Sequence, residues 1–461
     1  MNSFDVINPA TGASVGRAPD ANVDDARKAI EQSVAAFPVW KARTAFERGE
    51  VLRRWRDLIL KNEDVIARLM TSEMGKPITE SRGEVKYAAG FVDWYAEEGK
   101  RAYGDLIPTH APGKRLLAMR QPVGPVYAVT PWNFPAAMVT RKVAPALAAG
   151  CTVVLKPAEQ SPLTAIKLVE LWAEAGGPAG VFQVLTTSDP VAVSEPFFAD
   201  ARVRKLTFTG STEVGKLLYA QAARTVKRVS LELGGHAPFL VFEDADIAAA
   251  VTQVMATKFR NAGQTCVCAN RIYVHASIRD AFVAKMAEAV SALRVGDPTS
   301  DTTQVGPLVD RAGLEKVESH VADALAKGAR AIVGGKAGQG LYFEPTLLVD
   351  VAAGMRILDE ETFGPIAPVL SFTSESDVVI AANNTPYGLA AYLWTRDLGR
   401  AFRVSEALEY GIVGVNDGLP ATPHAPFGGV KASGVGREGG RWGLDEYLDV
   451  KYVSISLPSD G

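Results

Sequence analysis

The chain has 461 residues, with 49 lysines and arginines against 52 aspartates and glutamates, and a formal net charge of −3. At roughly 150 residues per domain, this length predicts several structural units with a sizeable buried core. The near balance of charge provides no basic surface for nucleic acid and no polybasic segment for an anionic membrane, so we expect a small-molecule partner.

The cysteine content and the start of the chain bear on the compartment. There are three cysteines, Cys151, Cys266 and Cys268, too few for a disulfide framework and typical of a reducing compartment. The first residues, MNSFDVINPATG, lack a charged segment followed by an apolar one. No run approaches the ~18 apolar residues of a membrane-spanning helix. We therefore expect a cytoplasmic protein.

The first part of the chain, to about residue 103, has a helical pattern. Residues 21–36 place apolar side chains at helical spacing after Asn22, with Asp24 and Asp25 in the first turn, which predicts a capped helix start. Residues 46–70 continue in the same manner.

From about residue 124, short β-branched runs alternate with helical stretches. This alternation predicts a parallel sheet covered on both faces, with nucleotide binding at the carboxyl ends of the strands. The expected strands are 126–130, 152–155, 181–185, 205–208 and 228–233, with helices such as 136–149 and 161–175 between them.

A second alternating series follows Gly234 and Gly235. Two α/β units joined at these glycines suggest a cleft between two domains. The expected strands are 237–242, 270–274, 331–333, 346–349, 367–372, 390–394 and 411–415. Strand-like residues 115–120 and 447–457 have no obvious place in either unit, and we expect them to form an arm that pairs with another subunit.

Cys266 lies in FRNAGQTCVCANR, among small and polar residues that are unusual around a buried structural cysteine. A thiolate is a strong nucleophile, which makes Cys266 a candidate for covalent catalysis. Taken alone, an inert core thiol is the better interpretation, because free cysteines are often buried, and only the surrounding motifs favour catalysis.

Two polar residues follow predicted strands in a way that suits catalysis. Glu232 ends an apolar strand before two glycines, where a carboxylate can face a cleft and act as a general base. Asn133 lies in the proline-bounded turn TPWNFP, where a fixed amide can donate to an oxyanion. The alternatives are a salt-bridged carboxylate at a strand end and an asparagine that caps its own turn.

Two further strand-to-helix junctions suit a dinucleotide. Lys156 and Glu159 lie in LKPAEQSP; a carboxylate here can bind ribose hydroxyls and repel a 2′-phosphate, which favours NAD over NADP. FTGSTEVG contains Gly210 and Ser211 at a helix start that can receive a pyrophosphate. The alternative for Lys156 and Glu159 is a solvated charge pair, and the alternative for FTGSTEVG is simple helix capping.

Taken together, these segments resemble the NAD(P)-dependent aldehyde dehydrogenase superfamily over nearly the whole chain. The motifs that carry the resemblance are TPWNFP, LKPAEQSP, FTGSTEVG, LELGGHAP, GQTC, EETFGP and PFGGVKASG. The resemblance implies an α/β fold with a Rossmann-like cofactor domain, an α/β catalytic domain and a small β oligomerisation arm. The implied ranges are 1–103 and 123–234 for the NAD-binding domain, 235–443 for the catalytic domain, and 104–122 with 444–461 for the arm.

The resemblance also assigns roles to residues. It implies Cys266 as nucleophile, Glu232 as general base and Asn133 as oxyanion donor, in an oxidation of an aldehyde to an acid through a thioester. It implies a homodimer or homotetramer. No cluster of cysteine, histidine and carboxylate residues has the spacing of metal ligands, so we expect no metal. The implied cofactor contacts, to NAD before NADP, are Thr130, Pro131, Trp132, Lys156, Glu159, Gly210, Ser211, Glu361 and Phe363.

Within the superfamily, FRNAGQTCVCANR and ALEYGIVGVN are most similar to succinate-semialdehyde dehydrogenases. That branch binds the substrate carboxylate with two arginines, which match Arg141 and Arg260 here, since guanidinium groups bind carboxylates bidentately. A serine that assists them is replaced by Ala421, with Thr422 beside it, so glutarate semialdehyde or an uncharged aldehyde stays an alternative substrate. Thr187 stands where the family has a glycine.

Two further hypotheses concern the cysteines and the class of enzyme. Cys268 lies two residues from Cys266, and similar pairs in this branch suggest a redox-sensitive disulfide. A cysteine hydrolase or acyltransferase would need a histidine partner, for which His236 is the best placed in sequence. A non-catalytic protein on the same fold is the third class. The five histidines are His110, His236, His275, His320 and His424.

Overall fold

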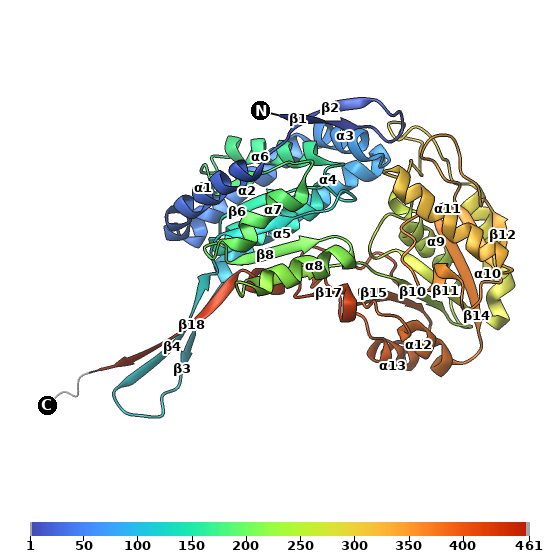
Figure 1. The fold of residues 1–461 in the computed structure, drawn as a ribbon. Coiled ribbons are helices and arrows are strands. Elements are labelled where there is room, and N and C mark those ends of the chain that lie inside the picture. Colours follow the sequence, from blue (N-terminus) through green and yellow to red (C-terminus); the bar gives the residue numbers. More distant parts are fainter. Residues whose placement is uncertain (1, 458–461) are drawn as a thin grey trace.

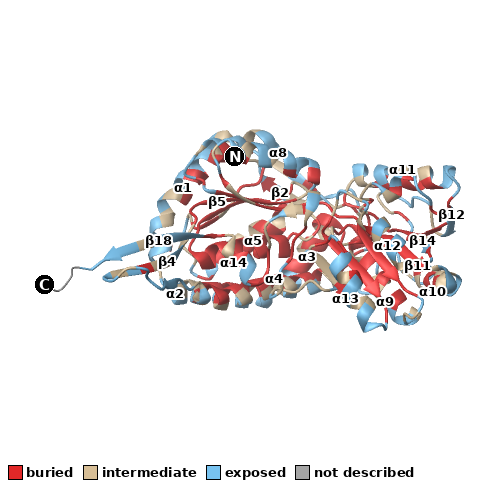
Figure 2. Cartoon of the chain, turned by 90° about the horizontal axis from the view of Figure 1, so that it is seen from below, coloured by how far each residue is buried: buried red, intermediate tan, exposed pale blue. Residues whose placement is uncertain are grey.

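The computed structural model describes residues 2–457, which form two α/β lobes and a projecting β arm (Figure 1). This arrangement confirms the predicted fold class. Helices cover the sheet of each lobe, and the strands between them are buried (Figure 2). No helix among residues 2–457 combines the length and apolar character needed to cross a membrane.

The chain opens with an antiparallel hairpin, where the sequence pattern had indicated only helix. Strands β1 (Ser3–Ile7) and β2 (Ser14–Pro19) pair with each other and are only partly buried, so little apolar alternation marks them. Helix α1 (Val23–Ala42) then begins as predicted, with Asn22 as N-cap and Asp25 completing a capping box. Next come α2 (Ala45–Lys61), α3 (Glu63–Met74), α4 (Ile78–Glu98) and the 3₁₀ turn η1 (Gly99–Arg101).

The sheet of the first lobe has the strand order β17-β9-β8-β5-β6-β7, parallel except for β17. Its strands are β5 (Val126–Val129), β6 (Val153–Lys156), β7 (Phe182–Val184), β8 (Lys205–Thr209), β9 (Arg228–Glu232) and β17 (Gly434–Val435). The intervening helices are α5 (Ala137–Ala149), α6 (Pro162–Glu174), α7 (Pro190–Ala199) and α8 (Thr212–Ala223). The first five strands lie where the sequence predicted them, whereas β17 returns from residues that we had expected to belong wholly to the other domain.

The second lobe has the strand order β12-β13-β14-β11-β10-β15-β16, parallel except for β12. Its strands are β10 (Ala237–Val241), β11 (Ala269–His275), β12 (Arg330–Val333), β13 (Thr346–Val349), β14 (Ile366–Phe372), β15 (Ala390–Trp394) and β16 (Ile412–Val415). Its helices are α9 (Ile247–Lys258), α10 (Arg279–Ser291), α11 (Arg311–Ala326), α12 (Glu375–Asn383) and α13 (Leu398–Ala407), with the 3₁₀ turns η2 (Arg260–Gly263), η3 (Ala276–Ile278), η4 (Arg356–Leu358) and η5 (Lys431–Ser433). The chain passes from one sheet to the other between Glu232 and Ala237, so the end of β9 lies beside the junction of the lobes.

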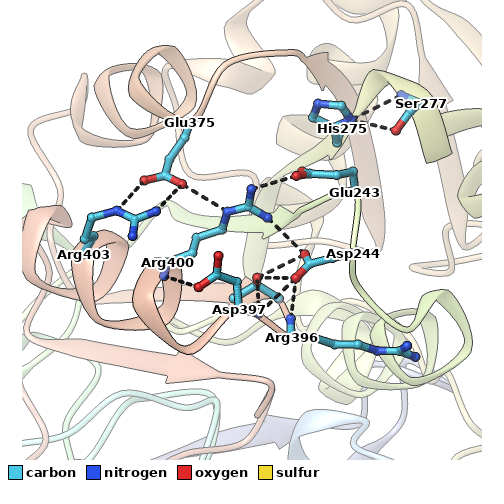
Figure 3. Close-up of polar contacts among 10 residues, drawn as sticks. Glu243, Asp244, His275, Ser277, Glu375, Arg396, Asp397, Arg400 and Arg403 are labelled. Carbon is cyan, nitrogen blue, oxygen red and sulfur yellow. Dashed lines mark hydrogen bonds and ion pairs between the residues drawn. The ribbon is translucent and has the colours of Figure 1, made fainter.

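A charge network joins the outer helices of the second lobe to the end of β10 (Figure 3). The Arg400 side chain, 16% exposed, pairs with the carboxylates of Glu243, Asp244 and Glu375 at 2.7, 3.1 and 3.0 Å. Arg403, 60% exposed, contacts Glu375 from the outside. The network holds α12 and α13 against the β10–α9 connection.

The arm consists of β3 (Asp105–Ile107), β4 (Lys114–Pro122) and β18 (Leu448–Ser456) in the order β18-β4-β3, all antiparallel. Helix α14 (Gly440–Asp445) leads into β18. The arm projects from the first lobe and is largely exposed (Figures 1 and 2). The domain boundaries in residue numbers stay a prediction, and their termini, residues 1 and 458–461, lie outside the described residues.

Candidate active site

Cys266 follows a turn with an unusual backbone between α9 and β11. Asn261, Ala262 and Gly263 have φ angles of 51°, 54° and 76° in succession. A Cβ on Gly263 would lie 2.1 Å from the carbonyl oxygen of Gly364, so this position requires glycine. A non-glycine residue in the left-handed region costs energy, and surrounding contacts must hold the turn in this form.

The polar contacts that hold the turn come from several elements. Glu80 of α4 accepts a hydrogen bond from the Asn261 N–H at 2.8 Å. The Gln264 side chain donates to the Asn261 carbonyl at 3.0 Å and accepts from the Val309 N–H at 3.0 Å. These bonds fix the backbone directly before Cys266, whose side chain is half-buried.

Burial outweighs the charges around Cys266 in setting the pKa of its thiol. Burial raises the pKa of the Cys266 thiol to about 12, while the positive charges of Arg141 and Arg260 act to lower it. Glu361 and Glu232 act in the opposite direction. The resting form is therefore the thiol, and a base must remove its proton before it attacks a carbonyl carbon.

The Asn133 side chain is buried against the same turn. Its amide Nδ2 donates to the Gln264 carbonyl at 3.1 Å. The backbone carbonyl oxygen of Asn133 accepts from Lys76 at 2.7 Å and from the Asn261 side-chain amide at 3.2 Å, while its side-chain Oδ1 has no hydrogen-bond partner. Asn133 thus lies next to the turn before Cys266, with its backbone fixed by Lys76 and Asn261 and its side-chain amide held by the single bond to Gln264.

Glu232 ends β9, where its backbone pairs with Gly434 of β17. The side chain is 2% exposed, and its Oε2 has no hydrogen-bond partner. A Cβ on Gly428 would lie 2.7 Å from Oε1, so that glycine makes room for the carboxylate. Burial and the negative charge of Glu438 raise the pKa of Glu232 well above its usual value.

Glu438 forms ion pairs with two cations that lie near Glu232. Lys142 donates to its Oε1 at 2.5 Å, and Arg141 Nε lies 2.6 Å from its Oε2. Although burial opposes it, these two cations keep the pKa of Glu438 below its usual value. Two nearby carboxylates with divergent pKa values are typical of acid–base chemistry.

The two arginines matched to a carboxylate clamp differ in their surroundings. Arg141 is 1% exposed, stacks on Phe427 at 4.1 Å and is committed to Glu438 as described above. Arg260 lies over the Phe134 ring at 5.3 Å, and its buried Nε has no hydrogen-bond partner. The buried Nε of Arg141 also lacks a hydrogen bond, but it forms an ion pair with Glu438, whereas Arg260 forms no ion pair among residues 2–457.

Thr422 and its neighbours lie on the loop before Phe427. The Thr422 hydroxyl lies 3.5 Å from His424 Nε2, and Ala421 beside it is half-buried. Thr187, which replaces a family glycine, donates its hydroxyl to the carbonyl of Ala21 at 3.0 Å. Its side chain thus ties β7 to the segment before α1.

The residues matched to cofactor binding in the first lobe follow adjacent parallel strands. Thr130, Pro131 and Trp132 follow β5, while Lys156 ends β6 and forms an ion pair with Glu159. Gly210 and Ser211 follow β8, and Ser211 caps α8 by accepting from the Val214 N–H. The strand order β8-β5-β6 brings these three carboxyl ends together.

Glu361 and Phe363 approach from the second lobe. Glu361 accepts a hydrogen bond from the Gly235 N–H at 3.1 Å, and burial raises its pKa to about 7. The Phe363 and Trp132 rings meet edge to face at 5.6 Å, which connects the two lobes. The interlobe junction thus carries residues from both sheets.

The unused polar atoms along this edge fit a dinucleotide. The buried hydroxyls of Thr130 and Thr209 have no hydrogen-bond partner. A Cβ on Gly234 would lie 2.9 Å from the Glu361 carboxylate, so glycine at this position leaves room for that side chain. Free hydroxyls and a capped helix start suit ribose and pyrophosphate groups.

Sequence reasoning missed four buried charges that support the site. Lys76 and Glu84 form a buried ion pair, and Glu84 Oε1 accepts from the N–H groups of Ala136 and Ala137 at the start of α5. Lys142 and Glu438 form the second pair. The available signal was a charged residue within an apolar helical run, as in VTRKVAPALAAG.

The described residues bear on the remaining hypotheses. His236 Nε2 lies 2.8 Å from the Leu358 carbonyl, and among residues 2–457 no histidine is hydrogen-bonded to Cys266. Both Cys266 and Cys268 are free thiols, and Lys258 donates to Cys268 at 3.3 Å. The disulfide stays a prediction. No cluster of three metal-ligating side chains occurs in residues 2–457.

Comparison with known proteins gives consistent matches over the whole length. Residues 1–453 match the model described as the aldehyde dehydrogenase family. A succinate-semialdehyde dehydrogenase [NADP(+)] of Escherichia coli is 54% identical, over 99% of this chain and 95% of the relative. A glutarate-semialdehyde dehydrogenase of Pseudomonas putida is 53% identical, over 98% and 94%. A crystal structure of an NADP-dependent enzyme of E. coli is also 54% identical and superposes with a TM-score of 0.98, over 99% of this chain and 95% of that chain.

The predicted preference for NAD is wrong in the light of these relatives, because the E. coli relative is named for NADP(+). The prediction rested on repulsion between Glu159 and a 2′-phosphate. In the structure, the ammonium group of Lys156 is paired with Glu159. Since this cation offsets the carboxylate charge, Glu159 does not exclude a phosphate by itself.

Proposed function

Because the chain belongs to the aldehyde dehydrogenase family, we propose that it oxidises succinate semialdehyde to succinate with NADP⁺ as the electron acceptor. The family establishes aldehyde oxidation, whereas the substrate and the acceptor are our proposals. The observation that carries the substrate is the Arg260 guanidinium, which acts on the Cys266 thiol, has a buried Nε without a hydrogen-bond partner and forms no ion pair among residues 2–457. The second matched arginine, Arg141, also acts on Cys266 but is paired with Glu438.

We assign the first step to Cys266 and Asn133. A base takes the proton of the Cys266 thiol, and the thiolate forms a C–S bond with the aldehyde carbon while the carbonyl oxygen becomes an oxyanion. The Asn133 amide and the Cys266 N–H donate to this oxyanion. When bound by Trp132, Glu361 and Phe363, the nicotinamide supplies a hydride acceptor for the aldehyde carbon.

Glu232 acts in the second half of the reaction. Its carboxylate takes a proton from a water molecule, which attacks the thioester carbon. The C–S bond then breaks, the acid leaves, and Cys266 is regenerated. Glu232 must be deprotonated to accept this proton, and its raised pKa makes it a better base once it is.

The main alternative substrate is glutarate semialdehyde, which is one methylene longer. Ala421 stands where the branch has a serine, and this smaller side chain leaves room for a longer substrate. The P. putida relative bears the name of that activity. A buried site discriminates by about 1–3 kcal/mol for one methylene, so both substrates are expected to react at different rates.

The decisive experiment follows the absorbance of reduced nicotinamide with purified protein and NADP⁺ or NAD⁺. The aldehydes are succinate semialdehyde, glutarate semialdehyde, butyraldehyde and benzaldehyde. A strong preference for a semialdehyde with NADP⁺ supports the proposal. Equal turnover of butyraldehyde contradicts the carboxylate clamp, and a preference for NAD⁺ contradicts the proposed acceptor.

We further propose that the β arm joins subunits into a homodimer or homotetramer. Leu106, Val450 and Tyr452 of the arm are 73%, 65% and 60% exposed, which is unusual for large apolar side chains on a free strand. A partner strand or helix would cover them. The free cysteines support our proposal of a reducing, cytoplasmic compartment.

A further inference from the structure

The segment 359–365, between η4 and β14, carries the two cofactor contacts proposed in the second lobe, Glu361 and Phe363. It belongs to no helix or strand. Phe363 has a φ of 55°, a left-handed conformation that is unfavourable for an aromatic residue. Contacts from outside the segment must therefore hold its shape.

One histidine contacts both neighbours of Glu361. The side chain of His320, on α11, is completely buried. Its Nε2 lies 3.0 Å from Glu360 Oε2, and its Nδ1 lies 3.2 Å from the Thr362 hydroxyl. We infer that His320 is a positioning residue, which fixes Glu361 and Phe363 in the orientation that binds the nicotinamide ribose and ring.

The surrounding charges define the form of the imidazole. Arg356 pairs with Glu360 and, together with His320, holds the pKa of that carboxyl at about 2, so Glu360 only accepts hydrogen bonds. Burial lowers the pKa of His320; the hydrogen bond and charge of Glu360 oppose this, and the cations Lys316 and Arg356 act with burial, so that the pKa stays below its usual value. The ring is therefore neutral near pH 7, with its proton on Nε2 and with Nδ1 accepting from the Thr362 hydroxyl.

The backbone of the segment lies directly on the same face of α11. A Cβ on Gly364 would lie 2.3 Å from the side chain of Val317, which precedes His320 by one helical turn. Close packing at Gly364 and two polar bonds from His320 thus fix the segment at neighbouring points. Neither His320 nor Val317 is among the residues that the family motifs assign to cofactor contact.

The experiment compares His320→Leu with the unchanged protein; it rests on the cofactor roles proposed above. NADP⁺ affinity is measured by titration calorimetry, with kcat and KM for the oxidation. Hydrolysis of p-nitrophenyl acetate without dinucleotide reports on Cys266, Asn133 and Glu232 alone. Loss of two polar bonds should weaken NADP⁺ binding and raise its KM by roughly tenfold, with ester hydrolysis unchanged.

Two kinds of variant separate positioning from stability. His320→Gln keeps a donor toward Glu360 and should retain most of the NADP⁺ affinity, whereas the shorter side chain of His320→Asn should not. If His320→Leu does not fold, the comparison of the glutamine and asparagine variants tests the inference in its place. Val321→Ala removes buried packing from the same helix without touching the segment, so it should lower the melting temperature and leave NADP⁺ affinity unchanged.

Three results would overturn the inference, and a fourth concerns only the proposed substrate. Normal NADP⁺ affinity in His320→Leu overturns it, as does an equal loss in Val321→Ala, which would make the role purely structural. Unchanged protein that binds NADP⁺ but oxidises no semialdehyde contradicts only the proposed substrate. Unchanged protein that binds no dinucleotide overturns both proposals.

Discussion

Replacing Arg260 by methionine tests the carboxylate clamp with least ambiguity. The Arg260 guanidinium packs on Phe134, and its Nε is buried without a partner, so a bound carboxylate would complete its hydrogen bonding. Methionine keeps much of the apolar contact with the ring and removes only the charge and the donors. The change should therefore weaken recognition of the substrate carboxylate while it preserves packing.

The magnitude follows from the loss of one charge-assisted hydrogen bond, about 1.5–3 kcal/mol. This corresponds to a fall in kcat/KM for succinate semialdehyde of roughly 10- to 150-fold. Butyraldehyde has no carboxylate, so its kcat/KM should change little. Arg260 also lowers the pKa of the Cys266 thiol, so any effect through Cys266 would lower both substrates equally.

The assay measures kcat/KM for both aldehydes with the unchanged enzyme, Arg260→Met and Arg260→Lys. The lysine variant keeps the charge without the planar fork and should be intermediate for the semialdehyde. A parallel fall for both aldehydes would refute the clamp and leave Arg260 as a residue that tunes Cys266. No fall for either would show that Arg260 does not contact the substrate.

Three further predictions follow from the charges and the arm. The rate of thioester hydrolysis should rise as pH passes through the raised pKa of Glu232, because only the carboxylate accepts a proton from water. Glu438→Gln should move this rise to lower pH, because it removes a negative charge that raises the pKa of Glu232, and an unchanged pH–rate profile would contradict this effect of Glu438. Arg400→Met should lower the free energy of unfolding by about 1–3 kcal/mol in urea, since it leaves three partly buried carboxylates without their shared cation, whereas Arg403→Met should cost less than about 1 kcal/mol. Val450→Asp should dissociate the oligomer in light scattering coupled to gel filtration, and an unchanged mass would place the subunit interface elsewhere.

The alternation of apolar runs and helical stretches was sufficient to predict most strands of both sheets. This is because a buried parallel strand is apolar on both faces and is followed by a helix of different period. The same reasoning failed for β1 and β2, which are only partly buried and pair with each other. It also missed β17, which is only two residues long.

The residue types at the site were likewise readable in sequence, because Glu232 ends an apolar strand before two glycines, Asn133 lies in a proline-bounded turn and Cys266 lies among small and polar residues. The charges and pKa values of these residues could not be predicted from the sequence. Lys142 and Glu438 are 296 residues apart in the chain and meet only in the folded protein. Arg141 looks like a free cation in VTRK, yet its partner is that same Glu438. Local sequence thus determined the elements and the reactive groups, whereas the tertiary structure decided their charges, because the pKa of a buried group depends on neighbours that the chain brings from far away.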